Sequence, residues 1–377
     1  MGEKMKRRLN LIAGSEIVSV VCLLLLNGMA FGYDITDKFS IGAVLAGAWQ
    51  YLEVDDDIEG VNDGPKAAVA FQPQMSFRPY ENSELFAKFG LAAGNGLNTE
   101  SPFALTIWAA DLENDVKDIN GRNRDYLLTA WGKYSFDFSK SHTLGLSGGI
   151  IDSTDYVDEN AFANDEYNQF LNEAFVNAPT GNFVSYDVGG VAQWAYGNFS
   201  ANGVIMDVGE NEDNNNYQFY ALQLAYRLET ALGEGNYRIS ASLTSDDFLN
   251  TDGKDLERLS ALTLSFDQKL GKIIGAFLRL GIQDNKAAIT WEKLYSGGLN
   301  LSGGIWGREQ DNIGIGFAYL DDGNTDLDNS LVAETYVRFV LNEMFAATAD
   351  FQYLADDVSG AKNPDGWVGG IRVTAEF

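Results

Sequence analysis

Apolar and polar residues alternate along most of this 377-residue chain, with a period of two. In 217–228, the even positions from Tyr220 read Tyr, Leu, Leu, Tyr and Leu, and the odd positions from Phe219 read Phe, Ala, Gln, Ala and Arg. The segments 67–78 and 272–283 repeat the pattern. Such alternation is typical of β-strands with one apolar face. No segment shows a helical period of comparable strength, so the sequence predicts an all-β fold.

The connections between these segments are alternately short and long. The short ones lie at 80–82, 139–141, 197–198, 270–272 and 342–343. The long ones are rich in Asp, Asn and Gly and lie at 54–66, 208–216, 246–257, 321–329 and 355–365. Short turns at one end and long loops at the other are typical of an outer-membrane β-barrel, in which strands of about 10 residues cross the bilayer.

Chain direction decides the number of strands. Counting every alternating segment as a strand would include 102–111. However, the tight turn at 139–141 lies on the periplasmic side, so the strand before it must start at the outer side. Residues 94–125 are then a single outer connection. The sequence then predicts a transmembrane, up-and-down antiparallel barrel of sixteen strands, with short periplasmic turns and long extracellular loops. The expected strands are 39–53, 67–79, 83–93, 126–138, 142–151, 183–196, 199–207, 217–230, 235–245, 258–270, 272–284, 294–308, 310–320, 330–342, 344–354 and 366–377.

The chain ends within an alternating segment, GWVGGIRVTAEF (366–377). An unpaired strand edge promotes aggregation. We therefore expect this last strand to pair with the first and close the barrel.

The first 32 residues resemble a secretory signal peptide. Four basic residues precede the apolar run 17–26, and small residues flank Phe31. We expect residues 1–32 to be cleaved, which removes Cys22, the only cysteine, and leaves the barrel as residues 33–377. The expected location is the outer membrane, in contact with its lipid and lipopolysaccharide.

The chain is strongly acidic, with a formal net charge of −28. Because residues 1–32 hold four basic and two acidic residues, the remainder holds 22 basic and 52 acidic residues. This balance excludes nucleic acid as a partner. The acidic excess lies in the loops, and calcium bridging between them and lipopolysaccharide is left open, as is a homo-oligomer.

The polar side of the strands is expected to line a water-filled lumen. Charges are expected there in any water-filled barrel, because a lipid-facing charge costs roughly 2–4 kcal/mol. Their mixed signs, together with aromatic rings, suit the hydroxyl groups and C–H faces of sugars; packing against an inserted loop is the alternative role. The candidate lining residues are Arg78, Trp131, Arg279, Trp306, Arg308, Glu334, Tyr336, Arg338, Asp350 and Arg372.

Two outer connections, 94–125 and 152–182, are long enough to fold into the lumen. Connections of this length are usually functional or disordered. Residues 152–182 carry spaced aromatic residues, among them Phe170 and Phe175, and are expected to pack as a constriction rather than form a loose cap.

No catalytic or metal site is expected, and no cofactor. Residues 145–149 match G-x-S-x-G, but that motif requires a strand–turn–helix elbow and here lies within a predicted strand. His142 is the only histidine, which argues against zinc. The acidic segment 321–329 lacks the closing glutamate of an EF-hand.

Five segments resemble the carbohydrate-selective porin family of the OprB type. They are NGRNRDYLL (120–128), the segment 152–179 around ANDEYNQFLNEAFVN, GREQDNIGIGFAYL (307–320), AETYVRFVLN (333–342) and VGGIRVTAEF (368–377). The resemblance implies a 16-stranded barrel that passes monosaccharides through a constriction bearing arginine and acidic residues, and it carries sugar contacts onto Glu334, Arg338, Asp350 and Arg372. The chain departs from the family at Ala349, where a proline is expected.

The predicted function is passive diffusion of carbohydrates across the outer membrane, without enzymatic turnover. A general or cation-preferring porin is the first alternative, because acidic loops concentrate cations at the mouth. A non-conducting structural or adhesive barrel is the second.

Overall fold

The computed structural model describes residues 33–55, 61 and 63–377. The expected signal peptide, residues 1–32, lies outside the described residues, as do 56–60 and 62 in the first long acidic loop. In the described part of the chain, no helix is long and apolar enough to cross a membrane.

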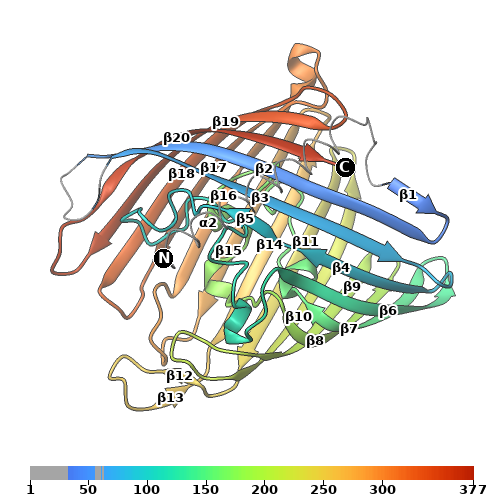
Figure 1. The fold of residues 1–377 in the computed structure, drawn as a ribbon, viewed down its shortest axis with the longest axis horizontal. Coiled ribbons are helices and arrows are strands. Elements are labelled where there is room, and N and C mark those ends of the chain that lie inside the picture. The colour runs from blue at the N-terminus through green and yellow to red at the C-terminus, as the bar shows by residue number, and fades with distance from the viewer. Residues whose placement is uncertain (1–32, 56–60, 62) are drawn as a thin grey trace, which may run out of the picture.

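Sixteen antiparallel strands form one closed barrel (Figure 1), as the alternation predicts. The strands are β2 (Phe39–Val54), β3 (Gly64–Phe77), β4 (Ser83–Phe89) with its short continuation β5 (Leu91–Ala93), β6 (Leu127–Ser139), β7 (His142–Ile151), β8 (Asp187–Tyr196), β9 (Phe199–Val208), β10 (Tyr217–Thr230), β11 (Gly233–Thr244), β14 (Ser260–Leu270), β15 (Ile274–Gln283), β16 (Lys293–Ser302), β17 (Asn312–Asp321), β18 (Leu327–Val340), β19 (Phe345–Val358) and β20 (Asp365–Glu376). Each strand pairs with the wall strands before and after it.

The terminal strand closes the barrel. β20 pairs with β19 on one side and with β2 on the other, where Ile371 lies opposite Trp49. The backbone amide of Phe377 donates to the carbonyl of Ala43 at 2.9 Å. Closure leaves no edge, as hydrocarbon surroundings require.

Alternation places apolar side chains outside and mixed side chains inside. On β10, Tyr220 and Leu222 are 45% and 50% exposed, whereas Phe219 and Gln223 are 0% and 1% exposed. The outward face is apolar because it contacts hydrocarbon, and the inward face follows what fills the lumen.

The boundaries differ from the prediction around the turn after β16. The expected strand 294–308 is wrong in its last part, because β16 ends at Ser302 and the 3₁₀-helix η4 (Gly303–Trp306) follows. The Ser302 hydroxyl accepts from the Gly304 amide at 3.3 Å, and Gly307 takes a positive φ of 79° that turns the chain. Trp306 and Arg308 therefore lie on a turn rather than in a strand.

Three short strands were not predicted. β1 (Tyr33–Thr36) pairs with the start of β2, and β12 (Phe248–Leu249) pairs with β13 (Leu256–Glu257) within a long connection. The connections from β10 to β11 and from β6 to β7 mark the short-turn end of the barrel, and β12 and β13 mark the long-loop end.

Two long connections enter the barrel. The first inserted loop (residues 94–126) contains no strand and only η1 (Ile119–Gly121), so 102–111 is part of a connection, as predicted. The second inserted loop (residues 152–186) contains η2 (Ser153–Asp155), α2 (Glu173–Val176) and η3 (Pro179–Gly181), and α2 contacts β16 and β17.

The largest apolar core lies inside the barrel. It joins Phe103 and Ile107 of the first inserted loop to Phe170 and Phe175 of the second, and both to inward side chains of the wall. On β17, a Cβ at Gly316 would lie 2.8 Å from the Phe175 ring, so only glycine allows this close approach. Packed protein therefore fills part of the lumen.

Candidate pore and its constriction

Arg279 fastens the second inserted loop to the barrel wall. Its guanidinium, on β15, is fully buried and its Nε lies 3.1 Å from the Asp158 carboxylate. The same guanidinium donates to the backbone carbonyls of Asp158, Ala163 and Phe175, at 3.1, 2.9 and 3.0 Å. A buried charge is stable only when paired and fully hydrogen-bonded, and Arg279 meets that condition through the loop.

Arg372, on β20, holds the middle of the same loop. It donates through Nη1 to the carbonyl of Glu166 and through Nη2 to the carbonyl of Gln169, both at 2.7 Å. Two positions on, the Thr374 hydroxyl donates to the Tyr167 carbonyl at 2.9 Å. Arg372 is therefore occupied by loop backbone.

Glu334, on β18, supplies the complementary contacts. Its two carboxylate oxygens accept from the amides of Leu171 and Asn172, at 2.6 and 3.0 Å. These amides precede α2, and a carboxylate suits this position because the first amides of a helix lack partners within it.

Tyr336 and Asp350 lie in the same covered region. The Tyr336 hydroxyl accepts from Asn300 and Asn312, and Asp350 accepts from Gln352 at 3.2 Å. Both residues are almost fully buried. Five of the ten predicted lining residues thus lie beneath the second inserted loop: Arg279, Glu334, Tyr336, Asp350 and Arg372.

The other five predicted residues lie elsewhere. Arg338 is half-buried, and its Nε has no hydrogen-bond partner within the described residues. Trp131 stacks on Phe86 at a centroid distance of 5.0 Å. Arg78, Trp306 and Arg308 lie towards the short-turn end, where Arg78 pairs with Glu84 at 3.2 Å and the other two contact Asp311.

A second group of charges meets around Lys88, on β4. The charges of Asp111, Asp152, Asp155 and Glu166, on the two inserted loops, act electrostatically on the Lys88 ammonium. Lys88 and Glu166 are partly exposed and Asp155 is exposed, although all three point into the barrel. Their solvent exposure identifies this side of the lumen as the open one.

Tyr186 links this group to the first inserted loop. Its hydroxyl donates to Asp111 at 2.7 Å, and the Lys88 ammonium lies 5.4 Å from its ring centroid. Gln72, on β3, donates to the same carboxylate at 2.6 Å. We call Lys88, Asp111, Asp155, Glu166 and Tyr186 the candidate constriction.

The loop carboxyls of the candidate constriction titrate unusually high. Burial raises the pKa of Asp111 to about 6, although Lys88 and the Tyr186 hydroxyl act in the opposite direction. Asp155 touches lumen water but is enclosed by protein, and this desolvation, followed by the Asp152 charge, raises its pKa to about 6. Burial, followed by Asp165, raises the pKa of Glu166 to about 8. Their charge therefore changes near neutral pH.

A cavity of about 700 Å³ lies between the two inserted loops and the candidate constriction. We call it the vestibule. Asn98, Thr106, Asp115 and Glu173 line it, and Asp111 and Tyr186 line it as well as the candidate constriction. Solutes in the vestibule would therefore meet mainly hydroxyl, amide and carboxyl groups.

Sequence patterns missed the loop residues of the candidate constriction. Lys88 has the inward parity of a strand, but Asp111 and Glu166 come from irregular backbone and Asp155 ends the single turn η2, so none of the three follows a period. The only available signal was the concentration of acidic residues in the two long connections.

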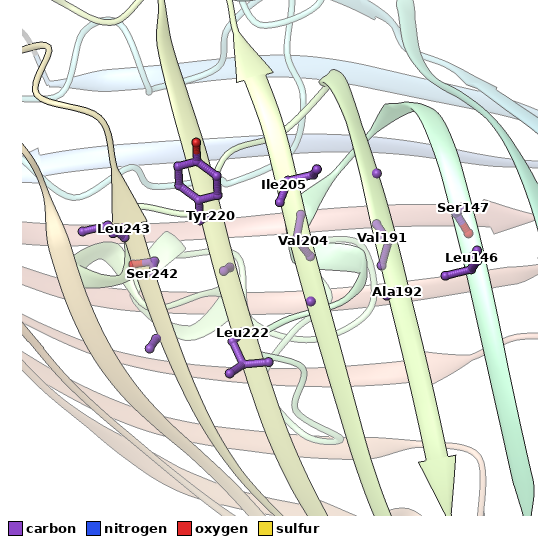
Figure 2. A pocket seen from close by; sticks show the side chains of 14 residues that line it. Leu146, Ser147, Val191, Ala192, Val204, Ile205, Tyr220, Leu222, Ser242 and Leu243 are labelled. Carbon is purple, nitrogen blue, oxygen red and sulfur yellow. The ribbon is translucent and has the colours of Figure 1, made fainter.

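A further cavity, of about 640 Å³, belongs to the wall rather than the lumen. Figure 2 shows its side chains on β7 to β11, with Leu146, Ile205, Tyr220 and Leu222 among them. These four are exposed on the outward parity, beside the small residues Gly190 and Gly203. It is a hollow in the apolar outer face and not a site for a polar solute.

A closed sixteen-stranded barrel with loops packed inside it and polar groups beside them defines a porin. Residues 87–377 match the family described as carbohydrate-selective porin, OprB family, and the chain belongs to that family. An uncharacterized protein of Aquifex aeolicus is 30% identical over 302 residues, which cover 78% of this chain and 84% of that protein.

Solved porins share the fold. The structure of Pseudomonas putida OprB at high pH has a TM-score of 0.70 at 12% identity, covering 90% of this chain and 94% of that one. OmpT of Vibrio cholerae has a TM-score of 0.55 at 12% identity, covering 91% and 99%. The family and the barrel indicate an outer-membrane channel rather than an enzyme.

Proposed function

We propose that the chain is a passive diffusion channel for carbohydrates in the outer membrane. The observation that carries the proposal is the division of the lumen. Packed loops fill one side, and a strip of solvent-exposed donors and acceptors around Lys88 remains on the other. A narrow wet path lined by such groups favours solutes that exchange hydrogen bonds with water for hydrogen bonds with the wall.

The mixed polar lining suits neutral sugars. Lys88 and the Tyr186 ring stand beside carboxyl groups, so a sugar can meet a donor, an acceptor and an aromatic face within one short section. Trp131 and the partly exposed Arg338 side chain provide further contacts of the same kind.

The covered residues act on solutes indirectly. Arg279, Arg372 and Glu334 position the second inserted loop and so set the width of the path. The family resemblance assigned sugar contacts to several arginine and acidic residues. In this proposal, some of these residues anchor the loop and others contact solutes in the lumen.

A cation-preferring porin is the second candidate. Four carboxyl groups act on Lys88, and the acidic excess of the outer loops concentrates cations at the mouth. The two candidate functions differ in which solute interacts more favourably with the candidate constriction, a neutral sugar or a cation.

Liposome swelling separates the candidates. Proteoliposomes containing the mature barrel are expected to swell faster in glucose than in neutral amino acids of similar size, and to swell in maltose as well. Equal rates set by size alone would favour a general porin. Absence of swelling and of conductance would favour a non-conducting barrel.

We further propose cleavage of residues 1–32 on export. Mass spectrometry of the outer-membrane form is expected to find an N-terminus near Tyr33. Contacts with lipopolysaccharide and a homo-oligomer belong to the same proposal, and crosslinking in native outer membranes tests both.

A further inference from the structure

A separate cavity of about 440 Å³ lies at the long-loop end of the barrel. Its lining comes from both inserted loops, from the connection that carries β12, and from residues 209–216 and 284–292. Ligand sites for small molecules usually occupy about 300–1,000 Å³, so the cavity has room for a small solute. We call it the outer-mouth pocket.

Aromatic rings form one part of this pocket. Phe183, Tyr217, Phe248 and Trp291 line it, and the rings of Tyr217 and Phe248 meet edge to face at a centroid distance of 4.9 Å. Hydrogen bonds fix the surrounding backbone, because Gln283 accepts from Asn182 at 2.8 Å and donates to the Trp291 carbonyl at 2.6 Å. The pocket is therefore preformed.

Unused polar groups form the other part. Among the described residues, the Tyr217 hydroxyl, the Thr290 hydroxyl and the Glu212 carboxylate line the pocket and have no hydrogen-bond partner. No lysine or arginine lines it, and Glu212 and Asp213 bring negative charge. Anions are therefore disfavoured, whereas a neutral ligand with several hydroxyl groups and an apolar face meets complementary groups.

The outer-mouth pocket adjoins the vestibule. Asn120, Phe183 and Ser185 line both cavities, so the two share part of one wall. The vestibule in turn borders the candidate constriction through Asp111 and Tyr186. The vestibule is therefore the next cavity that a solute released towards the lumen would meet.

We propose that the outer-mouth pocket is a saccharide-binding site, selective for a neutral sugar of one or two rings, that loads the channel at low external concentration. The inference rests on the proposed carbohydrate channel and adds a binding step before diffusion. Sugar rings would pack on Phe248 and Tyr217, and their hydroxyl groups would bond to Tyr217, Thr290 and Glu212.

Titration of the full barrel in detergent with maltose, followed by isothermal calorimetry, tests this site. Tyr217→Phe combined with Glu212→Gln keeps the shape of the pocket and removes a hydroxyl and a charge. We expect the dissociation constant to rise about tenfold, as the loss of one or two hydrogen bonds predicts. The matched control is Tyr220→Phe with Glu343→Gln, on the outward face of β10 and at the short-turn end, and it is expected to bind as the wild type does.

Swelling assays run in parallel keep this inference distinct from the proposed function. The pocket variant is expected to slow sugar entry at concentrations below the dissociation constant and to leave entry at saturating sugar unchanged. Sugar permeation with no saturable binding, or with equal binding by the pocket variant, would overturn the site and leave the channel proposal standing. Saturable binding lost in the pocket variant, without permeation, would support the site and contradict the channel proposal.

Discussion

The two sides of the lumen use the same kinds of residue for opposite purposes. On the wall from β15 to β20, Arg279, Glu334 and Arg372 are sealed beneath the second inserted loop and bond to its backbone. On β4 and β6, Lys88 and Lys133 stay partly exposed to the lumen. An inward charge therefore becomes an anchor or a solute contact according to whether a loop covers it.

The largest effect is expected from substituting Arg279, which holds the second inserted loop against the barrel wall. Arg279→Ala leaves Asp158 buried without its partner, which costs about 3–5 kcal/mol. The second inserted loop should then detach from the wall, raising single-channel conductance and making the loop sensitive to protease.

Asp158→Ala in the same background provides the control for Arg279. Removing both charges should recover part of the lost stability, measured as thermal unfolding in detergent. A single Arg279→Ala variant with wild-type conductance and protease resistance would show that this ion pair does not seat the loop.

A smaller effect is expected from substituting, one at a time, two arginines of the predicted site, Arg372 and Arg338. Arg372→Ala removes two hydrogen bonds to the loop backbone and should cost about 2–3 kcal/mol, with noisy conductance. Arg338→Ala should leave stability nearly unchanged and weaken sugar block of the current. Thermal unfolding and conductance measured side by side check this division, and similar losses in both assays for both variants would argue against it.

A smaller effect on ion selectivity is expected when pH changes the charge of the candidate constriction. Asp111 and Asp155 have pKa values of about 6, so acidification from pH 8 to pH 5 neutralises them and should reduce cation preference. Because these carboxyls bind protons more tightly in the folded state than in the unfolded state, their ionisation costs stability as pH rises from about 4 to 6.

Reversal potentials across a potassium chloride gradient measure the pH effect. Asp111→Asn should flatten the pH dependence, whereas Asp252→Asn, in the loop between β12 and β13, should not. An unchanged reversal potential from pH 8 to pH 5 in the wild type would place these carboxyls outside the ion path.

The barrel could be predicted from the sequence because its physics is local and periodic. A strand that faces lipid on one side and lumen on the other must alternate, so the segments 142–151 and 217–230 matched β7 and β10 at both ends. The terminal pairing of β20 with β2 followed from the need to leave no edge.

The candidate constriction could not be predicted in the same way, because it depends on where irregular loops lie. Arg279 and Lys88 both have inward parity, and nothing in the strand pattern distinguishes the sealed residue from the wet one. A partial signal existed in wall glycines that make room for loop rings. A Cβ at Gly275 would lie within 2.3 Å of the Phe162 ring.

Single-channel recording of the mature barrel in a planar bilayer, with and without glucose and maltose, tests the central claim most directly. A wet path beside packed loops predicts a steady open level that sugars reduce in a concentration-dependent way. A barrel without any open level, or one whose current is indifferent to sugars and rises only with cation concentration, would contradict it.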